Sequence, residues 1–121
     1  MPRAYNDSQR NFWRTVTNDG RYPCALQNLR KPCDGPIDAH HYLPKARINW
    51  QLDGKKGPRA TMARGDVRNG ICLCRLHHDM VHQAINPAIC PAPPFYALFL
   101  ADHGLHDDRP RYATPVDEVS A

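Results

Sequence analysis

The stretch from residue 69 to residue 83, NGICLCRLHHDMVHQ, carries two of the five cysteines and three of the seven histidines of this chain. It begins with a polar turn at Asn69-Gly70 and continues with a short apolar run over residues 71–74. Apolar residues then recur at helical spacing, on what would be one side of a helix: Leu76, Met80, Val81 and Ala84. The rest of the chain is expected to be organised around this stretch.

The spacing of the cysteines and histidines within this stretch predicts two metal sites. His78 and His82 are four residues apart, so on a helix they share one face and can hold one metal ion between them. Cys74 and His77 are three residues apart and straddle the start of the helix, which suits a second, structural site. The alternative is that the histidines are ordinary surface residues of an amphipathic helix. The other cysteines and histidines of the chain favour metal.

Length and composition predict a small protein that needs extra stabilisation. With 121 residues and 12 prolines, the chain is expected to form one loop-rich domain with a modest core. Such domains often depend on disulfides or a metal. Five cysteines beside seven histidines favour a metal site with spare thiols. No apolar leader and no run near the ~18 apolar residues of a membrane span are visible. A reducing cytoplasm, without a membrane partner, is therefore expected.

The net charge of +4 is small but unevenly distributed along the chain. Between Lys45 and Arg75 there are eight lysines or arginines against two aspartates. The last 21 residues hold five acids against two arginines. A basic middle segment suits a phosphate backbone as partner. For any single one of these residues, the alternative is a solvated surface charge.

Cys24 and Cys33 lie in a proline-broken loop, with eight residues between them. This separation is wider than the two to four residues usual between paired zinc ligands, and a local disulfide is the alternative interpretation. Together with Cys74 and His77, the pair completes a Cys3His set, the number of ligands that a closed tetrahedral zinc site requires. Zinc is favoured because disulfides are rare in a reducing compartment. Cys72 is the obvious substitute ligand.

A second cluster of histidines occurs in residues 38–45, DAHHYLPK. Pro44 is expected to end a short strand there. Because neighbouring residues on a strand face opposite ways, His40 and His41 cannot both be ordinary core residues. One of them can bind a metal while the other faces a substrate. Asp38 lies two residues before His40, on the same face, and is expected to orient it as a hydrogen-bond partner.

Helices are expected on both sides of this core, which makes the predicted fold α+β. Asp7 or Ser8 can cap a helix that ends at Thr17, and a second helix is expected from Phe95 to His103 with Gly104 after it. The stretch 45–68 lacks periodicity and is expected to be a long loop. The predicted packing residues are Phe12, Trp13 and Val16 in the first helix and Phe95, Leu98, Phe99 and Leu105 in and after the second. The expected boundaries within the single domain 1–121 are 1–20 for the N-terminal helix, 24–85 for the core, 91–108 for the C-terminal helix and 109–121 for a mobile tail.

The order of these residues resembles the HNH nuclease family and its ββα-metal (His-Me finger) fold. The matching stretches are DAHHYLPK at residues 38–45 and RNGICLCRLHHDMVH at residues 68–82. A His-His pair on a strand, an Asn nine residues before the first helix histidine of the pair, and His-x3-His follow the family's order. Small HNH proteins of phages and bacteria often add a cysteine-rich zinc knuckle. The order of Cys24, Cys33, Cys74 and His77 resembles that arrangement.

The resemblance implies a role for each matching residue. His41 matches the general base that activates water, and Asn69 matches the residue that orients this base and ties its loop. The residues that match the ligands of the catalytic ion are His40, His78 and His82, of which His82 can contact phosphate instead in relatives. The implied ion is Mg²⁺, Mn²⁺, Ni²⁺ or Zn²⁺, separate from the structural Zn²⁺. The cations beside the motifs, expected to hold phosphates, are Lys45, Arg68 and Arg75.

The implied activity is metal-dependent hydrolysis of phosphodiester bonds in intact or nicked double-stranded DNA, with one divalent ion on the scissile phosphate. The chain would then act in the cytoplasm, that of the bacterial host if a phage encodes it. Two alternatives stay open. One is a non-catalytic, zinc-stabilised nucleic-acid-binding module. The other is a structural zinc protein that assembles with phage or host proteins.

Overall fold

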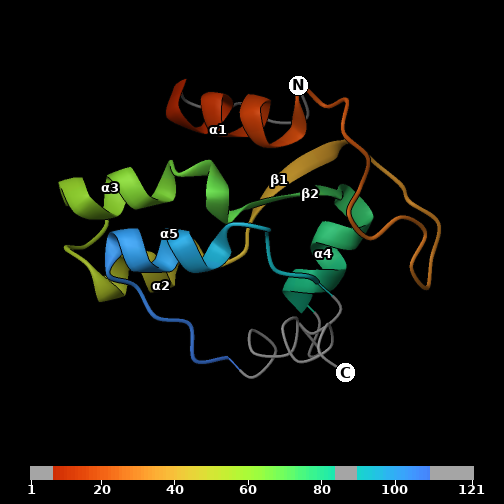
Figure 1. Cartoon of the computed structure of the whole chain (residues 1–121). Helices are drawn as coiled ribbons and strands as arrows, with labels where there is room; N and C mark the ends of the chain where they lie inside the picture. The colour runs from red at the N-terminus through yellow and green to blue at the C-terminus, as the bar shows by residue number, and fades with distance from the viewer. Residues whose placement is uncertain (1–6, 84–89, 110–121) are drawn as a thin grey trace.

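The computed structural model describes residues 7–83 and 90–109, and within them the predicted α+β class is confirmed as a two-stranded antiparallel sheet with five α-helices. Figure 1 shows the elements in chain order. They are α1 (Asp7–Thr17), β1 (Ile37–His41), α2 (Lys45–Gln51), α3 (Pro58–Arg64), the 3-10 helix η1 (Val67–Asn69), β2 (Gly70–Cys74), α4 (Arg75–Gln83) and α5 (Tyr96–His103). Residues 1–6 of the expected N-terminal segment, the end of the expected core at 84–85 and the expected tail from residue 110 lie outside the described residues.

The two strands pair with each other, and the long connection of residues 42–69 joins them. β1 pairs antiparallel with β2, so that Ile37 lies opposite Cys74 and His41 lies opposite Gly70. Side chains alternate across β1: Asp38 and His40 are buried, and Ile37, Ala39 and His41 are half-buried. Helices α1 and α4 each contact both strands, and they lie on either side of the sheet in Figure 1. The sheet is therefore covered on both faces although it has only two strands.

The predicted N-terminal helix is confirmed as α1. Its Phe12 is buried, and the indole Nε1 of Trp13 donates a hydrogen bond to the carbonyl of Ile37 (2.8 Å), which fixes the helix to β1. The helix also lies close to the start of β2: a Cβ added at Gly70 would lie 2.3 Å from Cγ2 of Val16. Glycine at position 70 is therefore required for this close approach.

The prediction of a long loop over residues 45–68 is wrong, because the structure has helices α2 and α3 there. Each helix has seven residues, which is too short for an apolar period to be visible in the sequence. Both start at prolines: Pro44 precedes α2, and Pro58 is the first residue of α3, a position where the missing N–H costs nothing. The carboxylate of Asp53 accepts hydrogen bonds from two backbone N–H groups at the start of α3 (2.9 and 2.8 Å) and so caps it.

The C-terminal helix is confirmed in position, but its buried face differs from the prediction. Phe99 and Leu105 are buried as predicted, whereas Phe95 and Leu98 were expected to pack and are instead 61% and 55% exposed. Tyr96 is buried in their place. The helix is anchored by polar groups after its end, since the Asp107 carboxylate accepts a hydrogen bond from the Tyr96 hydroxyl. Gly104 follows the helix with φ +65°, as the predicted C-terminal cap requires. Within residues 7–83 and 90–109, no helix has the length and apolar character that crossing a membrane would need.

Candidate metal centres

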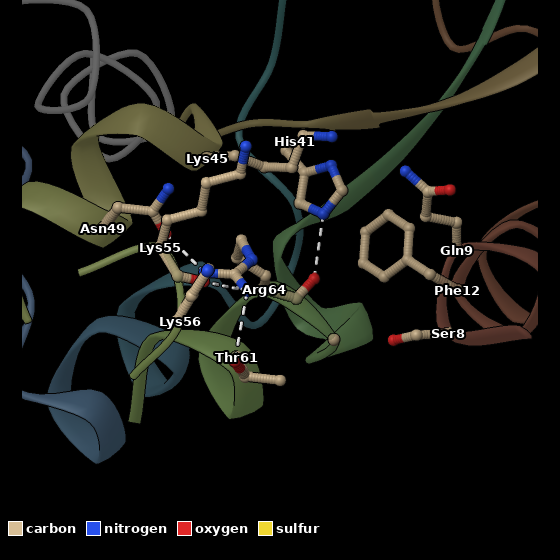
Figure 2. A pocket seen from close by; sticks show the side chains of 11 residues that line it. Ser8, Gln9, Phe12, His41, Lys45, Asn49, Lys55, Lys56, Thr61 and Arg64 are labelled. Atoms are coloured by element: carbon tan, nitrogen blue, oxygen red, sulfur yellow. Dashed lines mark hydrogen bonds between the residues drawn. The ribbon is translucent and has the colours of Figure 1, made fainter. Parts of the chain in front are cut away.

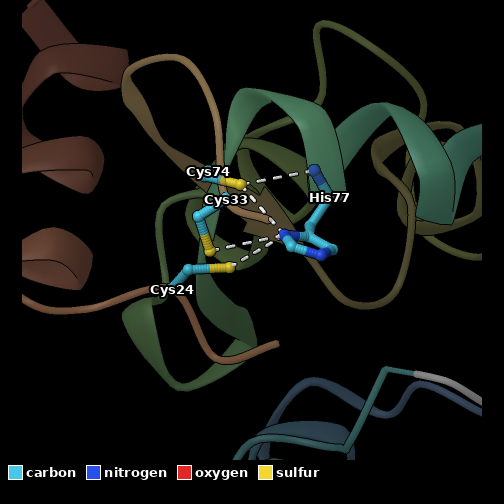
Figure 3. Close-up of side chains that lie close together, drawn as sticks. All are labelled: Cys24, Cys33, Cys74 and His77. Carbon is cyan, nitrogen blue, oxygen red and sulfur yellow. Dashed lines mark hydrogen bonds between the residues drawn. The ribbon is translucent and has the colours of Figure 1, made fainter. Parts of the chain in front are cut away.

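The predicted Cys3His ligands come together at one point (Figure 3). The Sγ atoms of Cys24, Cys33 and Cys74 lie 3.7, 3.6 and 3.0 Å from Nδ1 of His77. In a tetrahedral zinc site, bond lengths of about 2.3 Å to sulfur and 2.0 Å to nitrogen place those atoms about 3.5 Å apart. All five cysteines are free thiols, so the disulfide alternative for Cys24 and Cys33 does not describe this structure. The cluster could hold a structural metal ion such as zinc.

The backbone around the cluster orients its ligands. Nε2 of His77 lies 3.0 Å from the carbonyl oxygen of Leu29, which assigns the proton to Nε2 and leaves the lone pair of Nδ1 for an ion. Backbone N–H groups also point at the sulfur atoms, as Leu26 N does at Cys24 and His77 N at Cys74, both at 3.4 Å. Such contacts favour thiolates, the form in which cysteine binds metal. The second sphere of contacts therefore fits a metal site.

The thiols of the cluster differ in acidity. Burial raises the pKa of the Cys24 thiol to about 11. For Cys74 burial acts in the same direction, but hydrogen bonds from His77 and the neighbouring backbone outweigh it and lower the pKa to about 7. The expected substitute ligand, Cys72, donates its S–H to the carbonyl of Tyr22 (3.4 Å) and is not part of the cluster. Of Cys24 and Cys74, the Cys74 thiol is thus the more ready to bind an ion at neutral pH.

His40, His78 and His82 form a second cluster, whose nitrogen atoms lie within 4.8 Å of one another. The ring centroid of His40 lies 5.1 Å from that of His78 and 5.2 Å from that of His82, so the three rings surround a common point. Nε2 of His78 faces Nε2 of His82 at 3.0 Å. Two nitrogen ligands of one ion, each at ~2.1 Å, lie about 3.0–3.4 Å apart. The predicted histidines are therefore together, in a geometry that suits one ion.

Asp38 orients His78, whereas the sequence pattern predicted that it would orient His40. Its buried carboxylate lies 2.9 Å from Nδ1 of His78, which assigns the proton to Nδ1 and turns Nε2 toward the cluster. The same carboxylate accepts two hydrogen bonds from the guanidinium of Arg75 (2.6 and 3.1 Å). Although burial opposes ionisation, these bonds hold the pKa of Asp38 below its usual range. A charged carboxylate behind a histidine is the usual support of a metal ligand.

His41 lies on the opposite face of β1 from this cluster, as the alternation of a strand requires. Its ring stacks on Phe12, with centroids 4.1 Å apart and planes within 5°. Nε2 lies 2.9 Å from the carbonyl oxygen of Arg64, so Nε2 carries the proton and Nδ1 keeps its lone pair (Figure 2). Burial lowers the pKa of His41 to about 4, which keeps the imidazole neutral at pH 7. A neutral imidazole held in this way can accept a proton at Nδ1.

Asn69 ties the segment after β1 to the start of β2, as predicted for the loop-tying residue. Its buried side chain accepts a hydrogen bond from Leu43 N (2.8 Å) and donates one to Leu43 O (3.1 Å). Its own carbonyl accepts from Tyr42 N (2.9 Å). Three bonds therefore fix the backbone directly after His41.

Two cavities meet at His41. The first, of 260 Å³, is lined by the histidines of the second cluster, and the other, of 420 Å³, is lined by basic side chains. The residues that line both are Gln9, Phe12, His41 and Lys45. The contribution of α1 to these walls was missed, since nothing in its sequence distinguishes Phe12 from any core aromatic residue.

Of the three predicted phosphate contacts, only Lys45 lines the cavities. Arg68 is engaged by two carboxylates, those of Asp66 (2.6 Å) and Asp102 (2.7 Å). Arg75 is engaged by Asp38, as described above. Their charges are thus balanced within the protein.

Comparison of the chain with known protein families, characterised proteins and solved structures finds no match. Its function has to be inferred from the chemistry of these residues.

Proposed function

We propose that this chain is a metal-dependent DNA endonuclease of the HNH type, in which β1, β2 and α4 form a ββα-metal core stabilised by structural zinc. One observation carries the proposal: the neutral His41 and the cluster of His40, His78 and His82 lie on opposite sides of the end of β1 and line adjoining cavities. A nucleic-acid-binding module would need neither this base nor the histidine cluster.

In the proposed reaction, His41 is the general base. Its Nδ1 takes a proton from a water molecule whose oxygen attacks the phosphorus atom, and the bond from phosphorus to the 3′ oxygen breaks. The imidazolium that forms keeps its Nε2–H on the carbonyl of Arg64, whose dipole stabilises the new positive charge. Phe12 restricts the ring to one plane by stacking on it. These contacts support a base that is already in place before the substrate binds.

A divalent ion bound by the histidine cluster would supply positive charge to the scissile phosphate and the departing oxygen. Three imidazole ligands leave positions open for oxygen atoms, unlike the closed four-ligand Cys3His cluster. Asp38 holds His78 in the orientation for this role, and Lys45 extends from the wall shared by the cavities toward an anionic substrate. The candidate ions remain Mg²⁺, Mn²⁺, Ni²⁺ and Zn²⁺.

The test is nicking of supercoiled plasmid by the purified chain in the presence of each of these four ions. His41→Ala should retain its zinc and its DNA affinity but lose about 10²–10⁴-fold in nicking rate, the usual contribution of a general base. His106→Ala is the matched control, because His106 is exposed and contacts Gln51 through its backbone N–H and carbonyl. Wild-type protein that binds DNA and nicks with none of the ions would instead support the binding module. Full nicking by His41→Ala would place the base elsewhere.

A further inference from the structure

The larger of the two cavities, 420 Å³ in volume, is lined by four cations from three parts of the chain (Figure 2). Lys45 comes from the start of α2, Lys55 and Lys56 from the loop after it, and Arg64 from the end of α3. Among the residues that the structure describes, none that lines this cavity is acidic. Its volume falls in the range of sites for small organic ligands, about 300–1,000 Å³, and exceeds what a lone inorganic ion needs.

Among residues 7–83 and 90–109, no carboxylate forms an ion pair with any of these four cations. Elsewhere in the molecule, Arg47, Arg68, Arg75 and Arg109 each have an aspartate partner. The acids nearest in sequence are both engaged elsewhere: Asp53 by the N–H groups at the start of α3, and Asp66 by Arg68 and His103. Unbalanced cations around one cavity create a positive potential that attracts anions.

The wall of the cavity is held in place by Arg64. Its guanidinium donates hydrogen bonds to the side chain of Asn49, to the carbonyl of Lys55 (2.9 Å) and to Oγ1 of Thr61 (3.1 Å). These bonds join α2, the loop and α3. Gly57 allows the loop to close, because a Cβ there would lie 2.1 Å from Cγ of Asp53. The two loop lysines are therefore presented by a fixed backbone, which limits the entropy lost when they bind an anion.

We infer that this cavity binds a second phosphate of the nucleic-acid strand, together with the sugar that joins it to the phosphate attacked beside His41. The inference rests on the proposed function, because the proposed base, His41, lines both this cavity and the cavity of the histidine cluster. Lys45 lines both cavities and would lie between the two phosphates. A strand that crosses His41 would then be held on both sides of the reacting bond, which fixes the scissile phosphate relative to Nδ1.

The probe is thymidine 3′,5′-bisphosphate, which carries two phosphates on one sugar as the backbone does; thymidine and inorganic phosphate are the comparison ligands. Backbone amide NMR shifts of the full chain as purified, without added divalent ions, report both the site and the affinity. The variants are Lys55→Gln/Lys56→Gln and the control Lys31→Gln/Arg21→Gln. Both pairs remove two positive charges from exposed residues, but only the first pair lines the cavity.

We expect the bisphosphate to shift the amides of Thr61 and Gly65, which line the cavity. The cavity variant should bind about tenfold more weakly, since two partly exposed ionic contacts are lost, and the control variant should stay within about twofold. Equal weakening in both variants would overturn the inference, as it would reflect net charge alone. Inorganic phosphate that binds as tightly as the bisphosphate would also overturn it, because a single-phosphate site would suffice.

This experiment separates the inference from the proposed function, because binding is measured without cleavage. Bisphosphate in the cavity of a protein that nicks no plasmid would refute the endonuclease and still support a phosphate subsite for a nucleic-acid strand. A protein that nicks plasmid but shifts no amide near the cavity with bisphosphate would support the endonuclease and refute the subsite.

Discussion

Cys74→Ser tests whether a metal ion in the Cys3His cluster holds the fold together. Cys74 is the last residue of β2, is 2% exposed, and its Sγ lies 3.0 Å from Nδ1 of His77. A serine hydroxyl does not ionise at neutral pH and cannot replace a thiolate ligand. The variant should therefore lose the ion and, with it, the link that the ion provides between the sheet and the loop that carries Cys24 and Cys33.

The size of the effect follows from the share of stability that such an ion supplies. A structural zinc ion is worth about 10–16 kcal/mol in small zinc domains, whereas whole domains are stable by only about 5–15 kcal/mol. A loss of just ~3 kcal/mol lowers the Tm of a domain of about 100 residues by roughly 12–24 °C. We therefore expect Cys74→Ser to lower the Tm by at least about 12 °C.

The matched control is Cys72→Ser, the same substitution at a buried position of the same strand. The Cys72 thiol donates a hydrogen bond to the carbonyl of Tyr22, which a serine hydroxyl can also donate, so this substitution should cost only about 1 kcal/mol. Calorimetry gives the Tm of each variant, and elemental analysis gives the zinc bound per chain. A Cys74→Ser protein with full zinc content and the Tm of Cys72→Ser would show that the cluster does not depend on this ligand.

Three further substitutions test other contacts. Gly70→Ala puts a methyl group 2.3 Å from Val16; it should displace α1 and reduce nicking with little loss of zinc, which paired activity and zinc assays would check. Asp38→Asn should raise the ion concentration for half-maximal nicking about 10–100-fold, measured by titration of the divalent ion. Hydrogen bonds from Arg68 and His103 outweigh burial and lower the pKa of Asp66 to about 2, below its unfolded value. The stability it contributes is thus present above pH ~4 and lost as the pH falls toward 2, so Asp66→Asn should destabilise at pH 7, but not near pH 2, in urea denaturation.

The sequence predicted the ligand clusters because their spacing reflects short-range geometry. Residues four apart on a helix and neighbours on a strand have fixed relative directions, and this was enough to bring His78 and His82 together and to separate His40 from His41. The wide spacing of Cys24 and Cys33 is compatible with one site, because the loop between them is long enough to bring both thiols to the same point. The N-terminal helix was predicted well because its cap and apolar residues lie in one continuous segment.

The contacts that the sequence could not predict join residues far apart in the chain. Asp38 pairs with His78 across 40 positions, and its proximity to His40 in sequence suggested the wrong partner. Arg68 is neutralised by Asp102, 34 residues away on α5. Helices α2 and α3 were missed because each is too short to show a period, and the cap of α3 comes from Asp53, outside the helix. For Asp38 and Arg68, tertiary contacts decide the outcome, and local spacing does not encode them.

His77 and His78 are joined by one peptide bond, yet they serve different clusters. Successive side chains on a helix diverge by about 100°, so α4 must keep one rotation about its axis for both rings to reach their partners. An ion that binds at one cluster and fixes this rotation therefore makes the binding of an ion at the other cluster more favourable. Coupling of this kind is reciprocal: if zinc in the Cys3His cluster raises the affinity of the histidine cluster for a divalent ion by some factor, that ion raises the affinity for zinc by the same factor. The two centres would then fill cooperatively, although they share no ligand.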